Sequence, residues 1–531
     1  MINSKKSTSI SYSEVGLLSK LTRDYLDGKP NVAELYNLES NSDSIPQLIQ
    51  ERQFSTSKRE VLVEVLQEQY GELKSKKVFK NIESLLLENT YTVTTGHQLN
   101  LFTGPLYFIY KIVSAIKTAE ELSQKYPENN FIPVYWMATE DHDFEEINHT
   151  YINGNKIQWN SDQTGMVGEF SLDGIEDAVS QFCSELGNSI ASQGLRKTIE
   201  KAYLGASNLA EATRVLVHYL FQSYGLVIID GNHPTLKNHF IPVIAKELFE
   251  RASFKSVSET ISSFEDSHKA QVNPREINLF YVIPGIRERI MLENDRYVVN
   301  NTDLSFSKTE IHKEFNLHPE RFSPNVILRP VYQECVLPNL VYIGGGAEVA
   351  YWLELKSTFD SFQIPYPLVQ IRDSFLMLSA KDSKKMTSLN LSVLDLFKKK
   401  DSLVKDLVDE RNPLSPELLK SKSAILSEIK SLQKSLVNYD RNLEKSVGAA
   451  QAGLEKVLER LETKVSGAVK RNQEDEWIKL DSLFESVYPG GVYQERRINF
   501  FEFYAQYGSE FLDRVFENTR PFCRGVRVLL R

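Results

Sequence analysis

A short acidic run is the part of this sequence with the clearest capacity for chemistry. Residues 139–146, Thr-Glu-Asp-His-Asp-Phe-Glu-Glu, carry five carboxylates within seven positions. Carboxylates about 5 Å apart repel each other by roughly 3 kcal/mol at an effective dielectric constant of 20. A cleft can hold them only with compensating cations, a substrate ammonium group or a shared proton. The alternatives are a solvated first turn of a helix, where the helix dipole favours acids, and a metal site formed by His142, His149 and an acid.

A histidine in a polar loop is the second candidate. The β-rich run 91–95 is followed by Gly96-His97-Gln98 and then by a helix that Pro105 can begin, because the first helical position needs no N–H. A ring nitrogen of His97 at that place can donate a hydrogen bond to a ligand or act as a base. A structural histidine with satisfied hydrogen bonds is the other interpretation.

These loops have to be positioned by a sheet. A β-rich run at 91–95 and apolar runs at 131–138, 225–230, 340–343 and 367–371 alternate with helical patterns, which predicts five strands in a doubly wound parallel α/β sheet. Ligands of such sheets bind outside the carboxyl ends of the strands. Both the histidine loop and the acidic run follow a strand, so we expect them to share one crevice.

Three glycines follow the fourth predicted strand and precede a helix over 347–359. Gly344, Gly345 and Gly346 would offer backbone N–H groups to a carboxylate or phosphate at the start of that helix. The run has neither the Lys-Ser/Thr of a Walker loop nor G-x-G-x-x-G spacing. Close packing of strand on helix is the alternative reason for the glycines.

Length and composition limit the class of protein. The chain has 531 residues, 41% of them hydrophobic and 25% charged, with a net charge of −9. That charge argues against nucleic acid as a partner, since phosphates require a cationic surface. The sequence shows neither a signal peptide nor an apolar run of membrane-spanning length, so we expect a cytoplasmic protein. Three scattered cysteines form no C-x-x-C pair, and no metal is predicted.

The rest of the chain divides around that sheet. We expect a helical lead-in over 1–90, a core over 91–380 with inserts at about 150–215 and 250–330, and a C-terminal segment over 488–531 packed on the core. A hairpin is expected at Pro284-Gly285.

A coiled-coil arm is expected over 381–487. Apolar residues from 425 to 468 recur at steps of three and four, which is typical of a coiled coil. The chain turns back either at 412–416 or, as we favour, at 439–442 with a kink at Pro413. An exposed apolar seam of this length predicts a homodimer.

The two ends of an out-and-back arm meet at its base. Lys381, Ser383, Lys384 and Lys385 precede the arm, and Gly490, Gly491, Arg496 and Arg497 follow it. Cations together with a glycine turn suit a polyphosphate. A solvated helix end is the alternative.

Four long motifs resemble those of the BshC family, the cysteine ligases of bacillithiol biosynthesis. They are TTGHQLNLFTGPLYFIYK, VYWMATEDHDFEEINH, YIGGGAEVAYW and PGGVYQER, in this order, with the helical arm between the last two. The resemblance implies a Rossmann-like core with inserts like those of class I aminoacyl-tRNA synthetases, and an arm used in dimerisation. It also implies that cysteine is joined to glucosaminyl malate, and that an adenine nucleotide (ATP or ADP) binds near the base of the arm.

We therefore expect three groups of site residues. The catalytic residues are His97, Asp141 and Asp143. The residues that bind the small-molecule substrates are Gly96, Gln98, Thr103, Glu140, His142, Asn148, Gly344, Gly345 and Gly346. The residues that bind the nucleotide are Lys381, Ser383, Lys384, Gly490, Gly491, Arg496 and Asn499. The alternative function is a nucleotide-binding assembly or scaffold protein that binds a small acid without turnover.

Overall fold

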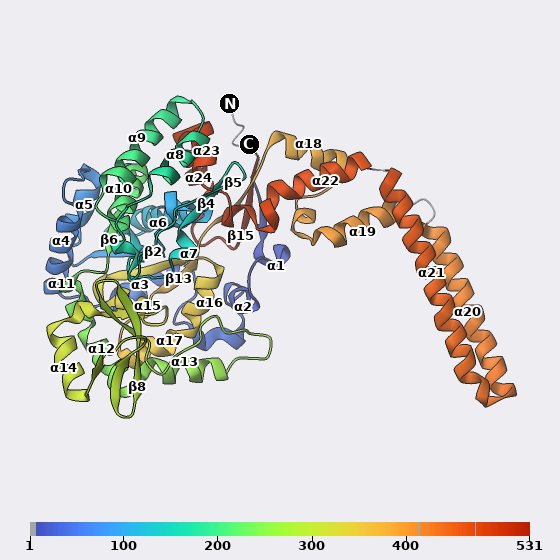
Figure 1. Ribbon diagram of the computed structural model, residues 1–531, viewed down its shortest axis with the longest axis horizontal. Helices are drawn as coiled ribbons and strands as arrows, with labels where there is room; N and C mark the ends of the chain where they lie inside the picture. The colour runs from blue at the N-terminus through green and yellow to red at the C-terminus, as the bar shows by residue number, and fades with distance from the viewer. Residues whose placement is uncertain (1–6, 412–414, 473, 531) are drawn as a thin grey trace. The chain divides into compact units, whose positions relative to one another are not determined.

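The computed structural model describes residues 7–411, 415–472 and 474–530. The chain forms two compact units, one comprising Met1–Leu376 with Val492–Leu529 and the other Met377–Gly491 with Leu530–Arg531. Figure 1 shows the elements of each unit. The two units are described separately below.

A five-stranded parallel sheet organises the first unit. Its spatial order is β13-β12-β2-β3-β6, and the strands are β2 (Thr90–His97), β3 (Asn130–Met137), β6 (Val227–Asp230), β12 (Asn339–Gly344) and β13 (Leu368–Ile371). All four neighbouring pairs run parallel. The direction of winding reverses between β2 and β12, which makes their carboxyl ends the topological switch point. The predicted doubly wound Rossmann-like sheet is confirmed, together with each of its five strands.

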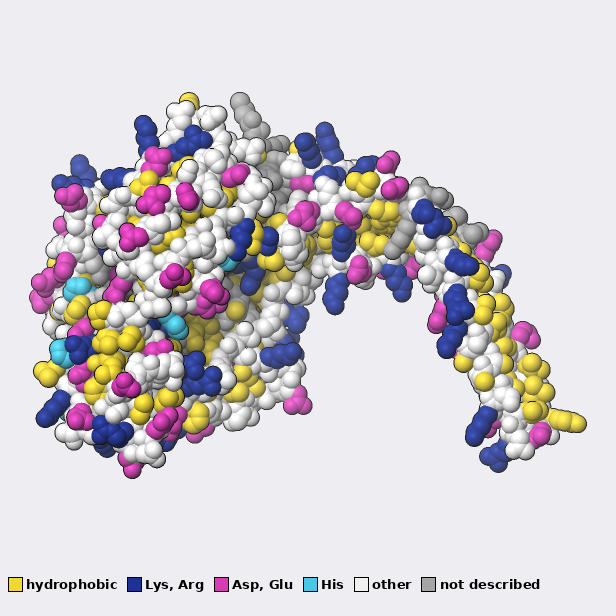
Figure 2. Space-filling view, in the orientation of Figure 1, with side chains coloured by type: hydrophobic (Ala, Val, Ile, Leu, Met, Phe, Trp, Pro, Cys, Tyr) yellow, Lys and Arg dark blue, Asp and Glu magenta, His cyan; other side chains and the backbone are white. Residues whose placement is uncertain are grey.

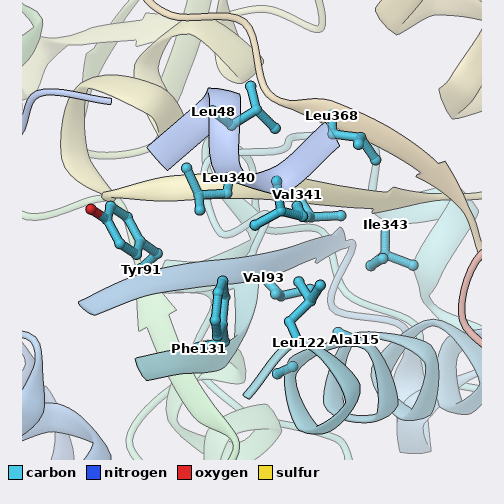
Figure 3. Packing of buried hydrophobic residues seen from close by; sticks show 12 residues of the cluster. Leu48, Tyr91, Val93, Ala115, Leu122, Phe131, Leu340, Val341, Ile343 and Leu368 are labelled. Carbon is cyan, nitrogen blue, oxygen red and sulfur yellow. The ribbon is translucent and has the colours of Figure 1, made fainter. Parts of the chain in front are cut away.

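Helices cover the sheet, and the residues of its strands are almost all buried, including the threonines of β2. Figure 3 shows α3 (Ile45–Glu51) on one side of the strands and α6 (Leu106–Lys125) on the other. Leu48 of α3 and Leu122 of α6 belong to one cluster of buried side chains with Val93 and Val341 from the central strands. Pro105, which was expected to be the first residue of the helix, lies immediately before α6, so the helix starts one residue later, directly beyond the loop that follows β2.

Two inserts interrupt the sheet. The first, between β3 and β6, contains a β-hairpin that is followed by three α-helices: β4 (His149–Ile152), β5 (Asn155–Gln158), α8 (Glu176–Glu185), α9 (Ile190–Gly205) and α10 (Leu209–Phe221). The second, between β6 and β12, holds an antiparallel sheet of order β10-β9-β8-β7-β11. Its strands are β7 (Leu279–Ile283), β8 (Ile286–Glu293), β9 (Arg296–Val299), β10 (Ser305–Phe306) and β11 (Phe322–Pro324).

The second insert also contains the expected hairpin. Ile283 lies opposite Ile286, and Pro284-Gly285 forms the connection, with Gly285 at a φ of 75°. The helices of this insert and those that flank β12 and β13 are α11 (Pro234–Lys237), α12 (Ile241–Glu250), α13 (Ala252–Ser262), α14 (Lys308–Leu317), α15 (Leu328–Val336), α16 (Gly346–Glu354) and α17 (Lys356–Phe362).

Both ends of the chain contribute to the first unit. Strand β1 (Ser7–Ser11) pairs antiparallel with β15 (Gly525–Leu530). The lead-in helices are α1 (Tyr12–Val15), α2 (Lys20–Leu26), α4 (Thr56–Tyr70) and α5 (Lys76–Ser84), and the C-terminal helices are α23 (Phe501–Tyr507) and α24 (Ser509–Asn518). After the acidic run a single helical turn, α7 (Phe144–Ile147), leads into β4.

The second unit is helical. It contains α18 (Ala380–Leu389), α19 (Lys400–Arg411), α20 (Ser415–Tyr439), α21 (Glu444–Asn472) and α22 (Glu474–Val487). The chain reverses between α20 and α21, as the prediction of a turn at 439–442 requires. Pro413, where a kink was expected, lies outside the described residues. Strand β14 (Ser374–Leu378) spans the boundary between the two units in the chain.

The hairpin of α20 and α21 leaves apolar side chains on its surface. Ile425, Leu432, Val457 and Leu461 are all more than a third exposed. Figure 2 shows such side chains along the hairpin, interspersed with charged ones. Within the described part of the chain, no helix combines the length and the apolar character that a membrane crossing requires.

Candidate active site

The first unit contains a cavity of about 740 Å³ at the carboxyl ends of its parallel strands. Gly96 and His97 at the end of β2, Met137 at the end of β3, and Tyr342 of β12 contribute to its wall. The remaining wall comes from the acidic run, the starts of α6 and α16, and the second insert. The location matches the crevice expected at a switch point.

The acidic run divides between the cavity and the surface. Glu140, Asp141, His142 and Glu146 line the cavity, whereas Asp143 is exposed and does not. Gln98 donates hydrogen bonds from Nε2 to Asp141 Oδ2 (2.8 Å) and to Glu146 Oε2 (2.9 Å). An amide with two donors thus lies between two carboxylates and offsets part of their repulsion.

Asp141 also orders the loop that carries it. Its Oδ1 accepts hydrogen bonds from the backbone N–H groups of His142 (2.7 Å) and Asp143 (3.3 Å). Its side chain remains 28% exposed. Asp141 is therefore an accessible carboxylate of fixed orientation. Asp143 instead lies at the solvated start of helix α7, which is the alternative considered for the acidic run.

Glu140 has a buried cation as its partner. Lys237 is fully buried, donates to Glu140 Oε1 and to the carbonyl of Phe322 (2.9 Å), and lies 4.9 Å from the ring centroid of Tyr332. Burial lowers the pKa of Lys237, and the carboxylate of Glu140 opposes that shift. The Glu140 charge is therefore balanced within the protein.

His142 is held by an arginine of the second insert. Arg287 donates from Nη1 to His142 Nδ1 (2.5 Å), from Nε to Ser323 Oγ (3.1 Å) and from Nη2 to the carbonyl of Pro324 (3.1 Å). Burial, followed by the charge of Arg287, lowers the pKa of His142. With Nδ1 accepting a hydrogen bond, Nε2 of the neutral ring carries the proton and can donate to a ligand.

His97 is buried beside aromatic rings. It stacks on Phe108 with 4.8 Å between centroids and meets the edge of Tyr107 at 5.2 Å. Burial lowers its pKa well below the ordinary value, and the charges of Lys111 and Arg372 act in the same direction. Its Nε2 has no hydrogen-bond partner among the described residues. At neutral pH the ring is uncharged and retains an unused nitrogen.

The glycine run does not present a free anion site. Gly345 N–H donates to Glu348 Oε2 (2.8 Å), so a carboxylate of the protein already occupies the start of α16. Glu348 also pairs with Lys111 (2.7 Å) and accepts from Tyr342 OH (2.8 Å). A Cβ on Gly344 would lie 3.0 Å from Cβ of Glu348. The run fits the close-packing interpretation, and Gly344, Gly345 and Gly346 lie beside the cavity rather than in its wall.

The sequence reasoning missed several cations in this wall. Arg329 of α15 donates from Nη1 to Gln333 Oε1 (3.0 Å), and its buried Nη2 has no hydrogen-bond partner in the described part of the chain. Lys111 could have been recognised, because it is a single charge within the apolar stretch of α6. Arg287 lies in the alternating strand β8, and Arg329 carries no comparable signal.

Two further predicted substrate-binding residues lie away from the cavity wall. Thr103 is buried in a tight turn in which Phe102, Thr103 and Gly104 all have positive φ values of 51°, 68° and 66°. Asn148 is the C-cap of α7 and is buried. Its Oδ1 lies 3.1 Å from Nδ1 of His149. Neither residue lines the cavity.

The residues predicted for a nucleotide separate between the units. Asn499 is fully buried in the first unit, where its side chain donates to the carbonyl of Phe102 and to Thr150 Oγ1 (both 2.9 Å) and accepts from Phe501 N–H (2.9 Å). Both amide donors of Asn499 are therefore used by the fold, and its side-chain oxygen accepts one hydrogen bond. Arg496 is exposed and lines a small cavity of the same unit.

The second unit has its own cavity, of about 410 Å³. Lys398, Lys399 and Lys400 line it, with the rings of Phe397 and Tyr488 and with Gly491. Gly490 N–H donates to Glu485 Oε1 (2.9 Å). Lys381 and Lys384 are exposed on α18, and Ser383 Oγ is buried, but none of the three lines this cavity. The wall also holds Phe484 and the carboxylates Asp481 and Glu485. Lysines and aromatic rings are the side chains that can contact the phosphates and the base of a nucleotide.

No group of three or more His, Cys, Asp or Glu side chains in the described ranges is arranged to hold a metal ion. His142 contacts Arg287, while His149 lies beside Asn148 and Tyr151. The two histidines therefore have separate surroundings.

The parallel sheet, the charged cavity at its switch point and the helical hairpin define a Rossmann-like ligand-binding protein with a coiled-coil domain. Comparison with known families makes this class specific. Residues 6–373 match the model described as "Bacillithiol biosynthesis BshC, N-terminal Rossmann-like domain", and residues 375–529 match "Bacillithiol biosynthesis BshC, C-terminal coiled-coil domain". The chain belongs to the BshC family.

Individual relatives match over almost their whole length. Proteins named "Putative cysteine ligase BshC" from Flavobacterium johnsoniae and Christiangramia forsetii are 45% and 40% identical, over 96% and 98% of this chain and 97% and 98% of theirs. A solved structure from Campylobacter jejuni, described as a "putative arginyl t-RNA synthetase", is 10% identical over 84% of this chain and 100% of its own. The TM-score between that structure and this one is 0.22.

Proposed function

We propose that this protein is an amide-forming cysteine ligase that joins cysteine to glucosaminyl malate in bacillithiol biosynthesis. Its relatives are named as cysteine ligases of the BshC family, over nearly the full length of the chain. The observation that carries the proposal is the cavity at the switch point, where an accessible carboxylate, Asp141, and an arginine with an unused donor, Arg329, share one wall. Such a site suits a ligand that bears both an ammonium group and carboxylates.

In this proposal Asp141 holds the ammonium group of the amino sugar. The amine has to lose its proton before it can attack the cysteine carboxyl carbon, and the Asp141 carboxylate is an acceptor for that proton. In the net reaction the C–N bond forms while one C–O bond of the cysteine carboxyl group breaks, and the departing oxygen leaves as water. Arg329 binds a carboxylate of the malyl group. His97, neutral and buried, hydrogen-bonds to the substrate through its unused nitrogen. Asp143 has no role in binding or catalysis in this proposal, because its side chain is exposed and does not line the cavity.

Deleting the gene from a host that makes bacillithiol tests this function. The expected result is loss of bacillithiol and accumulation of glucosaminyl malate, both measured by mass spectrometry of cell extracts. Normal bacillithiol without accumulated glucosaminyl malate would overturn the assignment. Restoring the gene with Asp141→Asn should not restore the thiol, whereas Asp143→Asn should.

An adenine nucleotide is proposed for the cavity of the second unit. The lysines at 398–400 would contact its phosphates, and Phe397 or Tyr488 would stack on its base. Titration of the purified protein with ADP at low ionic strength is expected to show binding. Measuring nucleotide consumption in the presence of cysteine and glucosaminyl malate then separates a consumed nucleotide from a structural one.

We also propose a homodimer that forms through the hairpin of α20 and α21. Ile425, Leu432, Val457 and Leu461 leave an apolar stripe on the hairpin surface, and such stripes are covered in most soluble proteins. Sedimentation of the full chain should give a dimer, and the variant Leu432→Lys/Leu461→Lys should shift it towards monomer. A variant that remains fully dimeric would remove the hairpin from the interface.

A further inference from the structure

One wall of the switch-point cavity is formed by a segment without helix or strand. Residues 271–278, here called the strap, connect the region after α13 to β7. Asn273, Arg275 and Asn278 of the strap line the cavity. A segment with no hydrogen-bonded ladder of its own needs other contacts to keep these side chains in place.

Two buried carboxylates supply these contacts at the two ends of the strap. Glu354, the last residue of α16, accepts hydrogen bonds from the backbone N–H groups of Gln271 (2.7 Å) and Val272 (3.1 Å). Glu247 of α12 accepts from the backbone N–H (2.9 Å) and the side-chain amide (3.3 Å) of Asn278. Both glutamates are 0% exposed.

Glu354 is energetically unusual because no Lys, Arg or His in the described ranges lies within ion-pair distance of it. Its two backbone donors are the compensation for its burial. A buried carboxylate without a cation costs stability compared with an apolar side chain. What it provides is a fixed orientation of the peptide groups at Gln271 and Val272.

The residue that benefits from this fixed strap is Arg275. Arg287 and Arg329, elsewhere in the wall, donate hydrogen bonds to protein groups. The guanidinium of Arg275 has no such bond or ion pair within the described part of the chain, and its side chain is exposed in the cavity wall. Its backbone N–H donates to Asn278 Oδ1 (3.1 Å), which ties Arg275 to the end of the strap that Glu247 holds.

We propose that Arg275 binds a carboxylate of the substrate and that Glu354 is a positioning residue that acts through Arg275 by fixing the strap. The proposal rests on the proposed function for the identity of the ligand, glucosaminyl malate, whose malyl group carries carboxylates. Arg275 supplies a bidentate donor for one of them. Glu354 touches no substrate, because its carboxylate is buried beneath the strap.

A double-mutant cycle tests the coupling. The variants are Arg275→Ala, Glu354→Gln and their combination, with Glu259→Gln, an exposed glutamate of α13, as the matched control. Binding of glucosaminyl malate to the full chain is measured by calorimetry. Arg275→Ala should raise the Kd for glucosaminyl malate by roughly 10- to 100-fold, as expected for the loss of a charged hydrogen bond. Glu354→Gln should raise it to a smaller extent, and Glu259→Gln should leave it unchanged.

The combination distinguishes positioning from a general structural role. If Glu354 acts through Arg275, the Kd of the double variant should lie within about twofold of that of Arg275→Ala alone. The reason is that the guanidinium whose position Glu354 controls is already absent. Losses that multiply in the double variant would overturn the proposal. Should Glu354→Gln fail to fold, Glu354→Asp, which keeps the charge and shortens its reach, takes its place in the cycle.

Amide hydrogen exchange gives a readout that needs neither ligand nor turnover. In the unmodified protein the amides of Gln271 and Val272 should exchange at least ~10-fold more slowly than that of Asn273. Glu354→Gln should abolish this protection and Glu259→Gln should not. Absence of protection in the unmodified protein would overturn the positioning role. Protection without binding of glucosaminyl malate by the unmodified protein would instead refute the proposed function.

Discussion

The two cavities of this protein obtain their positive charge in different ways. In the first unit, Lys111 comes from α6, Arg287 from β8 and Arg329 from α15, and each is tied to a partner within the fold. In the second unit, Lys398, Lys399 and Lys400 are consecutive and exposed. Lys398 pairs with Asp395 and Lys400 with Asp481, both at 2.9 Å.

This difference separates two kinds of electrostatic site. Buried donors with fixed directions favour one ligand geometry and are little affected by salt, at a cost in desolvation. Exposed lysines provide attraction that salt screens, with little demand on geometry. We therefore expect substitutions in the first cavity to change stability, specificity or turnover, and substitutions in the second to change affinity alone.

The largest effect is expected for the carboxylate of the first cavity. Asp141→Asn removes the charge that would hold an ammonium group and accept its proton. We expect kcat/KM for amide formation to fall by about 100-fold, the lower end of the range for a lost general base. Ligation of cysteine to glucosaminyl malate, followed by mass spectrometry, measures it.

The matched control is Asp143→Asn, two residues away and exposed. Its activity should stay within about twofold of the unmodified protein, because a solvated charge at a helix start contributes little to a distant ligand. If both variants lose activity equally, the whole acidic run acts on the ligand and the division between cavity and surface is wrong.

The next effect concerns stability. Lys111 is almost fully buried, and Lys111→Met leaves the Glu348 carboxylate and the carbonyl of Gly96 without their cation. Breaking one partner of a buried pair costs about 3 kcal/mol in unfolding free energy. Glu348 is partly exposed, so water will recover part of this cost. Urea denaturation measures the change in unfolding free energy. Adding Glu348→Gln to Lys111→Met should recover most of the lost stability. If the loss persists unchanged in the double variant, the packing of Lys111, and not its charge, stabilises the protein.

The sequence was sufficient to predict the features that are local. One β-rich run and four apolar runs predicted the five parallel strands, and two strand ends placed Gln98 and Asp141 in a shared crevice. The cations Arg275, Arg287 and Arg329 were not predictable in this way, because an insert far along the chain brings the first two to the cavity. Asn499 and Arg496 were predicted together for a nucleotide, yet Arg496 is exposed while the side chain of Asn499 is buried in the fold. Sequence proximity does not determine side-chain direction in an irregular segment.

The third effect is a pH dependence of stability that belongs to the first unit. Burial raises the pKa of Glu354 to about 7 from an ordinary value near 4.5. The folded state therefore binds more protons than the unfolded state between these values, and the contribution of Glu354 to stability is complete below pH 4.5 and lost as pH rises through 7. Between pH 5 and 8 the loss should be roughly 2 kcal/mol.

Chemical denaturation at several pH values measures this change. Glu354→Gln should flatten the decline by that amount, because an amide does not titrate in this range. Glu259→Gln should leave the decline unaltered. An identical pH profile in Glu354→Gln would mean that the Glu354 carboxyl ionises in the folded protein as easily as in water.

The smallest effect is expected in the second cavity, and it tests the other half of the comparison. Lys399 is exposed and forms no ion pair with the described residues. Lys399→Ala should weaken ADP binding by about three- to tenfold at low salt, and the difference should shrink as salt is raised to about 0.5 M, because screened surface charges contribute little. Melting temperature should not change. Lys381→Ala, on α18 and outside the cavity wall, is the control and should bind ADP normally. A loss at Lys399 that is independent of salt would show that this lysine is held in place on binding, as Arg287 and Arg329 of the first cavity are. The two cavities would then differ in location but not in kind.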